Sequence, residues 1–402
     1  MTLVRAAGRL SLVLWLGIAS CTSTPHGPGQ DGTGRTAIAS KKQSRFPGLS
    51  QAHAQAAESG PRKLPSSSSG DMLDRLWTRD ELRGNTGEAR SHRLPAPDRE
   101  GPQPSGIAVT HAARGRVDRT TIRGARPEGG AKLVALTFDL CERDDEVAGY
   151  DAAIVNYLRD QQVRATFFAG GRWMASHPEK TMQLMADPQF ELGNHSWSHL
   201  NLRQQPPDVV EREIAWPQIE YALLRDRLAH LAREKGVPAR EIDRVPTAPR
   251  LFRFPFGTCT PEALGQVAEQ GLRAIQWDVV TGDPAPKQTA SGIVSTVLGQ
   301  VKPGSIVIMH ANGRGHGTAE ALRQFVPALR ARGFEFVTVS ELLARAQDLE
   351  TADECYELRP GDNRRYDRLS SETSPPRGPA TRFPGGGARI PAPAATGSSS
   401  RP

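Results

Sequence analysis

Two histidines four residues apart are the first feature of this 402-residue sequence that indicates chemistry. His195 and His199 lie in the run Asn-His-Ser-Trp-Ser-His, and on a helical turn both imidazoles would face one side and could bind one cation. A hydrolytic metal site also needs an anionic base nearby and an open position for water. Five further side chains of suitable type are Asp139, Arg253, Asp278, Asp283 and His310.

These side chains follow short apolar runs that are typical of strands. The predicted strands are 132–138, 164–169, 189–193, 250–254, 272–277, 305–309 and 334–338. Helical patterns alternate with them, at 148–161, 173–186, 208–235, 261–270, 288–300, 318–332 and 340–346. This alternation predicts an α/β fold with parallel strands, and seven strands favour a distorted (β/α) barrel over the alternative, a doubly wound sheet. In either fold, active residues belong just past the carboxyl ends of strands.

Composition limits the folded part of the chain. With 39 glycines, 32 prolines and only 6% aromatic residues, much of the sequence cannot build a core. We predict a signal peptide at 1–21, a disordered Pro/Gly/Ser-rich linker at 22–131, the barrel domain at 132–345 and a disordered tail at 346–402. Within the linker, residues 71–83 have helical spacing of apolar side chains, and whether this helix docks stays open.

The formal net charge of +7 does not indicate a nucleic-acid partner. The excess of positive charge lies in the first 131 residues, whereas residues 132–345 hold 24 basic and 25 acidic side chains. A net charge near zero in the folded domain disfavours the attraction of a polyanion to a basic face.

The first residues indicate export. Arg5 and Arg9 precede an apolar run at 10–18 that is too short to span a bilayer, as in a secretory signal. The run leads to Ile-Ala-Ser-Cys, and Cys21 therefore resembles the lipidated cysteine of bacterial lipoproteins, although an ordinary cleavable signal is the alternative. We expect an exported protein held in the bacterial cell envelope by an N-terminal lipid. Its other cysteines would then meet an oxidising compartment.

Five motifs in order resemble the polysaccharide deacetylases of carbohydrate esterase family 4, also called NodB-homology domains. They are Thr-Phe-Asp at 137–139, His-Ser-Trp-Ser-His at 195–199, Arg-Phe-Pro-Phe-Gly at 253–257, residues 277–283 and Ile-Met-His at 308–310. The resemblance covers nearly all of residues 132–345.

The resemblance implies a role for each matched residue. Asp139 would be the catalytic base, with Arg253 holding it, and Phe256 would offer its backbone N–H to the oxyanion. His310 would be the general acid, oriented by Asp283. The two histidines at 195 and 199 would bind a divalent metal, zinc before others.

One departure from the family's pattern concerns the metal. The family places a ligating aspartate at the position of Leu140, and leucine cannot bind a cation. A third ligand could come from Glu142, Asp144, Cys141 or Asp139, or from extra waters, and loss of the metal is the remaining alternative.

The resemblance also suggests a disulfide. If Arg253 contacts Asp139, then Cys141 and Cys259 approach each other, and we expect them to pair, with a thiolate metal ligand as the second use of Cys141. Cys355 has no evident partner in the sequence.

The resemblance implies a hydrolase that removes N-acetyl groups from peptidoglycan or a secreted polysaccharide. Two alternatives stay open. One is an inactive, lipid-anchored glycan-binding protein that has kept the cleft, and the other is a cell-wall tether that acts through its basic flank.

Overall fold

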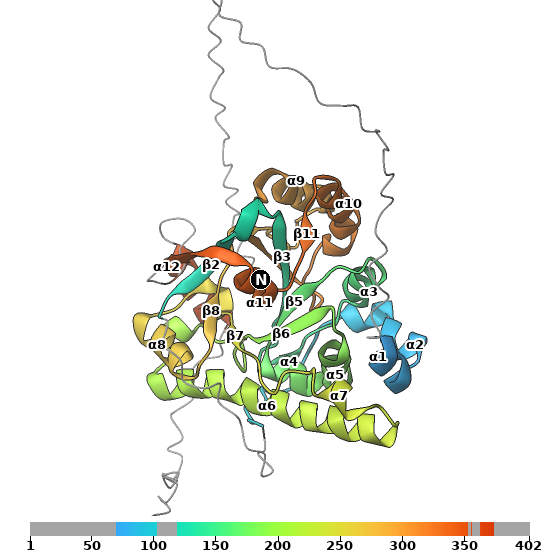
Figure 1. Cartoon of the computed structure of the whole chain (residues 1–402). Coiled ribbons are helices and arrows are strands. Elements are labelled where there is room, and N and C mark those ends of the chain that lie inside the picture. Colours follow the sequence, from blue (N-terminus) through green and yellow to red (C-terminus); the bar gives the residue numbers. More distant parts are fainter. Residues whose placement is uncertain (1–69, 103–118, 353–354, 356–361, 374–402) are drawn as a thin grey trace, which may run out of the picture. The chain divides into compact units, whose positions relative to one another are not determined.

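Seven strands close into a barrel, which is visible at the centre of Figure 1. The computed structural model describes residues 70–102, 119–352, 355 and 362–373. In order around the ring, the barrel strands are β3 (Leu133–Leu140), β5 (Ala165–Ala169), β6 (Phe190–Asn194), β7 (Leu251–Phe252), β8 (Arg273–Ile275), β2 (Thr121–Pro127) and β10 (Ser305–His310). The strand β10 pairs with both β2 and β3 and so closes the ring. The predicted seven-stranded α/β barrel is confirmed, and the doubly wound sheet is wrong.

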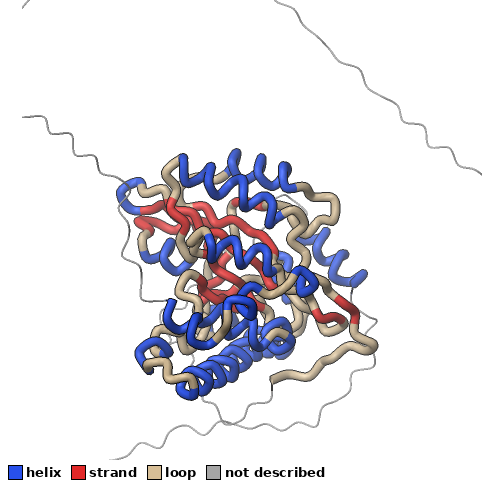
Figure 2. Tube along the Cα trace, turned by 90° about the vertical axis from the view of Figure 1, so that its right-hand side faces the viewer, coloured by secondary structure: helices blue, strands red, loops and turns tan. Residues whose placement is uncertain are grey.

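Helices connect the barrel strands and surround them (Figure 2). They are α3 (Ala152–Asp160), α4 (Gly171–Ser176), α5 (Pro178–Ala186), α6 (Pro207–Glu234), α7 (Ala239–Ile242), α8 (Pro261–Glu269), α9 (Ala290–Gln300), α10 (Thr318–Ala331) and α11 (Val339–Ala344). Local sequence sets several starts: Thr260 and Thr289 accept hydrogen bonds as N-caps of α8 and α9, and Thr338 forms a capping box with Glu341. In the described part of the chain, no helix is long and apolar enough to cross a membrane.

Short elements complete the domain. Besides β7, the two-residue strands are β1 (His92–Arg93), β4 (Glu146–Val147), β9 (Val279–Val280) and β11 (Glu335–Phe336). The 3-10 turns are η1 (Thr86–Ala89), η2 (Glu128–Gly130), η3 (Leu202–Gln204) and η4 (Pro255–Gly257).

The seventh barrel strand differs from the prediction. The predicted strand at 334–338 is β11, which pairs with β3 outside the ring, while β2 completes the ring from within the predicted linker. Gly124 and Pro127 interrupt the apolar pattern of β2. Its stability as a strand comes from pairing with β8 on one side and with β12 (Ala346–Ala352), in the predicted tail, on the other.

The described part of the predicted linker is also folded at residues 70–102. It forms α1 (Gly70–Leu76) and α2 (Arg79–Arg83) as well as η1 and β1. Met72, Leu76 and Trp77 are buried in the main hydrophobic cluster, so the segment at 71–83 docks on the domain. The prediction of disorder is therefore wrong for these residues, because their few apolar side chains lie on one face. The predicted signal and the rest of the linker up to residue 69 lie outside the described residues.

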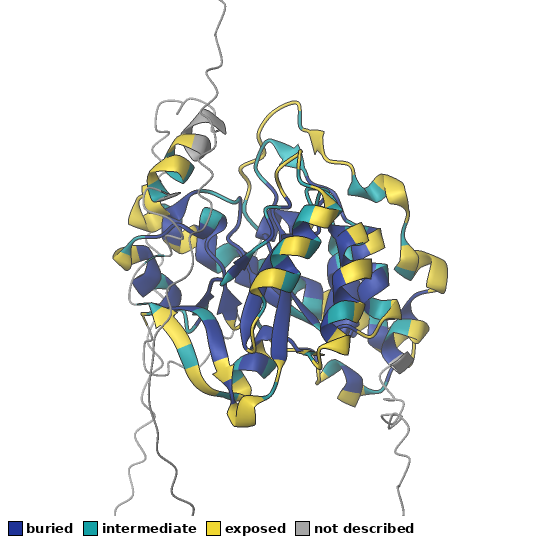
Figure 3. Ribbon diagram, turned by 90° about the horizontal axis from the view of Figure 1, so that it is seen from above, coloured by how far each residue is buried: buried dark blue, intermediate teal, exposed yellow. Residues whose placement is uncertain are grey.

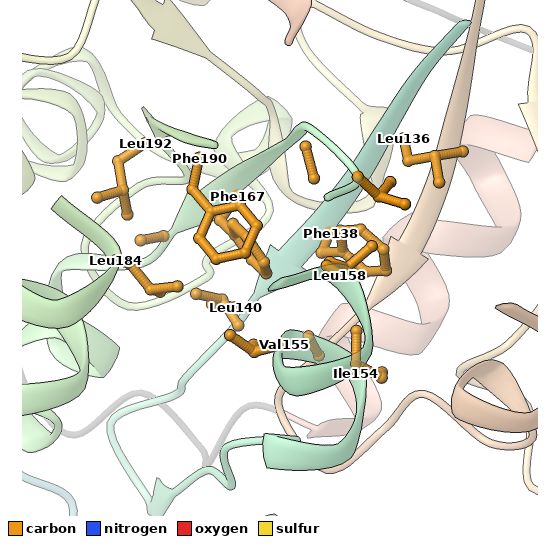
Figure 4. Packing of buried hydrophobic residues seen from close by; sticks show 14 of the residues in the cluster. Leu136, Phe138, Leu140, Ile154, Val155, Leu158, Phe167, Leu184, Phe190 and Leu192 are labelled. Carbon is orange, nitrogen blue, oxygen red and sulfur yellow. The ribbon is translucent and has the colours of Figure 1, made fainter. Parts of the chain in front are cut away.

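Side chains alternate strictly along β3, and this alternation positions the site. Leu136, Phe138 and Leu140 point outward into the cluster beneath the helices, where Figure 4 shows Leu140 among Leu184, Phe167 and Val155. Thr137 and Asp139 therefore face the interior of the barrel. Figure 3 shows the buried strands enclosed by helices with exposed outer faces.

Candidate active site

Five of the sequence-predicted polar residues gather at the carboxyl end of the barrel: Asp139, His195, Arg253, Asp283 and His310. Asp139 and His310 are register partners on the adjacent strands β3 and β10. His195 follows β6, Arg253 follows β7, and Asp283 follows β9. The side chains of Arg253 and Asp139, which lie 114 residues apart in sequence, are in this way joined by a hydrogen bond.

A buried ion pair forms the centre of the site. Nη1 of Arg253 donates to Oδ1 of Asp139 at 2.8 Å and to Oγ1 of Thr137 at 2.8 Å. The guanidinium carbon lies 4.0 Å from the centre of the Phe168 ring. Burial lowers the pKa of Arg253 from its ordinary value, against the opposing effect of Asp139. The pair fixes one oxygen of Asp139 and leaves Oδ2 at 3.6 Å from Nε2 of His195.

His195 has a defined tautomer. Its Nδ1 lies 2.9 Å from the carbonyl oxygen of Arg253, and because a carbonyl only accepts, Nδ1 carries the proton. In the neutral imidazole the lone pair is then on Nε2, which lies 3.4 Å from Sγ of Cys141. Metal-binding histidines typically donate a hydrogen bond from the other ring nitrogen in this way, to a carbonyl or a carboxylate.

Cys141, His195 and His199 together form a group that could hold a metal ion. Their ligand atoms all lie within 4.8 Å of one another, and Cys141 is 2% exposed. Burial raises the pKa of the Cys141 thiol, but His199 and His195 outweigh this effect and leave the pKa well below its ordinary value. One sulfur and two imidazole nitrogens are a ligand set that zinc accepts.

Leu140, Glu142 and Asp144 point elsewhere. Leu140 is fully buried in the core. Oε2 of Glu142 accepts hydrogen bonds from the Ala148 N–H and the Ser176 hydroxyl, and Asp144 forms an ion pair with Arg99. The structure therefore does not bring the two predicted third ligands, Glu142 and Asp144, to the histidines.

Cys141 comes to the histidines instead, and a sequence signal could have found it. Side chains on a strand alternate between its two faces, so Cys141, two positions after Asp139, shares the inward face with it. Leu140, between them, faces outward. The sequence had offered a thiolate only as the second use of Cys141.

The segment that carries His199 is a loop and not the helical turn on which the sequence argument would place both imidazoles. Residues 195–199 form a loop in which Ser196 and His199 have φ of 65° and 55°. Glu213 of α6 braces the loop, because its carboxylate accepts from the Ser198 N–H at 2.9 Å and from the Ser198 hydroxyl at 2.6 Å. Sequence reasoning missed Glu213, which lies within a long helical pattern.

His310 and Asp283 form a second hydrogen-bonded pair. Nδ1 of His310 lies 2.9 Å from Oδ1 of Asp283, whose other oxygen accepts from the His310 N–H and the Thr318 hydroxyl. Burial acts to lower the pKa of His310, but Asp283 raises it well above the ordinary value. Since Nδ1 is engaged, Nε2 is the nitrogen that can exchange a proton with a ligand. Thr318 was not predicted from the sequence.

Asp278 lies at the opposite end of β10. Its carboxylate accepts hydrogen bonds from the Ile306 N–H and the Ser305 hydroxyl, so it has a structural role there. Trp197 and Trp277 are buried, at 5% and 7% exposure, and belong to the core. Phe256 is half-buried, has a left-handed φ of 61°, and its ring lies 4.7 Å from that of His199.

The disulfide differs from the prediction. Cys259 pairs with Cys355, and Cys141 is a free, buried thiol. The contact between Arg253 and Asp139 exists, but the turn η4 carries the chain away before Cys259, which packs against Phe252 and Phe254. A short separation in sequence therefore did not mean proximity in space.

Comparison with known proteins finds similarity to polysaccharide deacetylases over part of the chain. The polysaccharide deacetylase family model matches residues 126–225. A peptidoglycan-N-acetylglucosamine deacetylase of Bacillus cereus is 29% identical over 217 residues, covering 54% of this chain and 70% of its own length. A chitooligosaccharide deacetylase of a Bradyrhizobium strain is 29% identical over 231 residues, covering 53% of this chain and 91% of its own length.

Among solved structures, a variant of a family 4 carbohydrate esterase pseudoenzyme with restored enzymatic activity is 23% identical with a TM-score of 0.44, covering 56% of this chain and 72% of its own. The family match and the two curated relatives agree with the predicted polysaccharide deacetylase domain and support the prediction of a hydrolase.

Proposed function

We propose that the protein is an active, metal-dependent deacetylase that hydrolyses the N-acetyl groups of an N-acetylated glycan. The observation that carries the proposal is the pairing of Asp139, held by Arg253, with His310, held by Asp283, in register on adjacent strands. A protein that only binds glycan has no use for both pairs.

The donor set at the centre fits a divalent ion. Cys141, His195 and His199 would hold it, and the mixed sulfur and nitrogen set favours zinc over the oxygen-seeking ions magnesium and calcium. A bound ion would polarise the acetyl carbonyl and acidify the attacking water.

The protein's own residues then move two protons. Asp139, with Oδ2 turned toward the histidines, takes a proton from the attacking water as the water oxygen adds to the acetyl carbon. His310 donates a proton from Nε2 to the sugar nitrogen as the carbon–nitrogen bond breaks, and Asp283 keeps its ring aligned. The products are acetate and a free amine, which is protonated in neutral solution.

Phe256 would stabilise the charge that develops on the carbonyl oxygen. Its left-handed backbone turns the chain beside His199, and a preorganised N–H at this position is an oxyanion donor. Backbone donors of this kind cost no reorganisation during the reaction.

The names of the relatives support a substrate class for this proposal. Peptidoglycan and chitooligosaccharides share N-acetylglucosamine, and we take an N-acetylglucosamine polymer as the substrate of this chain. Export and lipid attachment at Cys21 are part of the same proposal, since they would place the enzyme beside peptidoglycan; the support is the pattern of Arg5, Arg9 and the apolar run before Cys21.

The test is acetate release from N-acetylglucosamine oligomers and from peptidoglycan, by the wild type and by Asp139→Asn. The substitution exchanges one oxygen for nitrogen in a buried pair, so we expect a folded protein whose rate falls at least about 100-fold. An Asp139→Asn rate within a few-fold of wild type refutes the role of Asp139. Oligomer binding without any acetate release by the wild type would establish the glycan-binding alternative instead.

The metal set has its own test, which does not depend on turnover. Cobalt(II) bound to a thiolate gives a near-ultraviolet sulfur-to-metal charge-transfer band. We expect this band in the wild type and its loss in Cys141→Ser, while Glu142→Gln keeps it. A band that survives in Cys141→Ser would remove Cys141 from the ligand set.

A further inference from the structure

The C-terminal segment returns to the wall of the site. Helix α12 (Asp362–Thr373) follows Cys355, whose disulfide to Cys259 spans 96 residues of sequence. Cys259 lies two residues beyond η4, the turn that contains Phe256. The disulfide therefore attaches this segment to the chain three residues after Phe256, the half-buried aromatic residue at the site.

Hydrogen bonds hold α12 on the loop that follows His199. Asp367 accepts from Nδ2 of Asn201 at 2.9 Å and from Nε of Arg203 at 3.3 Å, and its backbone oxygen accepts from Gln204. All three partners come within five residues of His199.

Asn201 also joins α12 to the turn that carries Phe256. It is 2% exposed, and its Oδ1 accepts from the Thr258 hydroxyl at 2.6 Å. A single buried amide thus connects the loop after a metal-set histidine, the turn beside the oxyanion position and Asp367 of α12. A helix that only covered apolar surface would not need this polar connection.

The contacts place Tyr366 in a row of rings that leads away from the metal set. The Phe256 ring lies 4.7 Å from His199 and 6.2 Å from Tyr366. Both Phe256 and Tyr366 are half-buried, whereas Trp197 and Trp277 are buried in the core. Half-buried aromatic side chains with apolar faces are suited to the apolar face of a pyranose ring.

We propose that the disulfide-held helix α12 forms one wall of the substrate cleft, with Tyr366 stacking on the sugar unit next to the one whose acetyl group is removed. The inference rests on the proposed function for the position of the acetyl group. It assigns to α12 a preference for oligomeric over monomeric N-acetylated sugars. The segment lies beyond the five family motifs, so this preference belongs to the chain's own C-terminal extension.

The first experiment measures binding without turnover. Chitotetraose carrying all four N-acetyl groups is titrated into the full chain in the Asp139→Asn background, and its affinity is compared among variants at Tyr366. Loss of one stacking contact weakens binding about three- to tenfold in Tyr366→Ala, whereas Tyr366→Phe keeps the affinity. Arg365→Ala, at an exposed position on the same helix, is the matched control and stays within twofold.

The second experiment removes the attachment. The double variant Cys259→Ser, Cys355→Ser should weaken oligomer binding by a similar factor while leaving the monomer, N-acetylglucosamine, unaffected. Thermal unfolding of each variant shows whether the domain remains folded, and in an otherwise active chain the KM for the tetramer should rise in Tyr366→Ala with kcat unchanged.

The outcomes separate this inference from the proposed function. The inference is overturned if the tetramer binds equally well with and without Tyr366→Ala in the Asp139→Asn background, or if it does not bind at all. Either result holds independently of whether the otherwise wild-type chain releases acetate. Acetate release by the otherwise wild-type chain decides the proposed function independently. If Tyr366→Ala lowers kcat as much for the monomer as for the tetramer, α12 has a general structural role and the inference fails.

Discussion

Replacing Leu140 with aspartate would restore the carboxylate that the family pattern places there, yet we expect this change to unfold the protein. Leu140 is fully buried and points into the cluster with Leu184, Phe167 and Val155, away from the histidines (Figure 4). The new carboxylate would not reach the metal set, because position 140 on β3 faces the side opposite to that of Asp139 and Cys141.

The magnitude has two parts. Loss of the leucine side chain costs about 2–5 kcal/mol, as for buried leucine to alanine. The new carboxyl must also be protonated to remain buried, which at pH 7 costs about 4 kcal/mol for a group of ordinary pKa near 3.9. Together these are roughly 6–9 kcal/mol, comparable to the whole stability of a typical domain, about 5–15 kcal/mol.

The assay compares three variants by denaturant unfolding and by zinc titration. Leu140→Asp should be largely unfolded at pH 7 and regain stability toward pH 5, where protonation costs less. Leu140→Met should lose less than about 1.5 kcal/mol and bind zinc as the wild type does. Cys141→Asp, which puts the carboxylate on the inward face, should remain folded and bind metal. A stable Leu140→Asp protein with tighter zinc binding would refute this reasoning and make position 140 a metal ligand.

Three other predictions concern parts of the structure that support the site. Burial raises the pKa of Asp151 from 3.8 to about 6, so between these pH values the folded state keeps a proton that the unfolded chain releases. The free energy of unfolding should therefore fall by up to about 3 kcal/mol as pH rises from about 4 to 6. In denaturation measured at several pH values, Asp151→Asn should lack this loss. Trp77→Ala should destabilise the domain by about 3–5 kcal/mol in denaturant unfolding, and an effect below 1 kcal/mol would show that α1 is not docked. Glu213→Gln should weaken zinc affinity about tenfold, measured by calorimetry, because the hydrogen bonds to Ser198 are weakened. Glu211→Gln, at an exposed position on the same helix, should leave the zinc affinity unchanged. Equal zinc affinities of the two variants would exclude a role for Glu213 in positioning the loop.

The strands and helices that could be predicted have a strong local pattern. Residues 132–138 and 305–309 are largely apolar runs, and they became β3 and β10 within two residues. By contrast, β2 contains Gly124 and Pro127 and is a strand because β8 and β12 pair with it. Pairing across the sheet cannot be read from the strand's own sequence.

The polar residues of the site could be predicted where they stand at the ends of predicted strands. A parallel barrel brings such residues together, and the contact between Arg253 and Asp139 was implied by the family resemblance. The side chain that replaces the missing aspartate must lie on the inward face of β3, and a shift of one residue changes the face. Strand periodicity would therefore have favoured Cys141. The partner of Cys259 could not be predicted, since Cys355 reaches it through a segment without any apolar pattern.

The central claim is that the Cys141, His195 and His199 set supports amide hydrolysis by Asp139 and His310. The most direct measurement titrates metal-free full-length protein with zinc and follows acetate release from N-acetylglucosamine oligomers in the same samples. We expect release to rise from near zero to a plateau at one bound ion per chain, and to be absent at every zinc concentration in Asp139→Asn. Full-rate release in the presence of chelator, or no release from protein with one bound ion, would contradict the account.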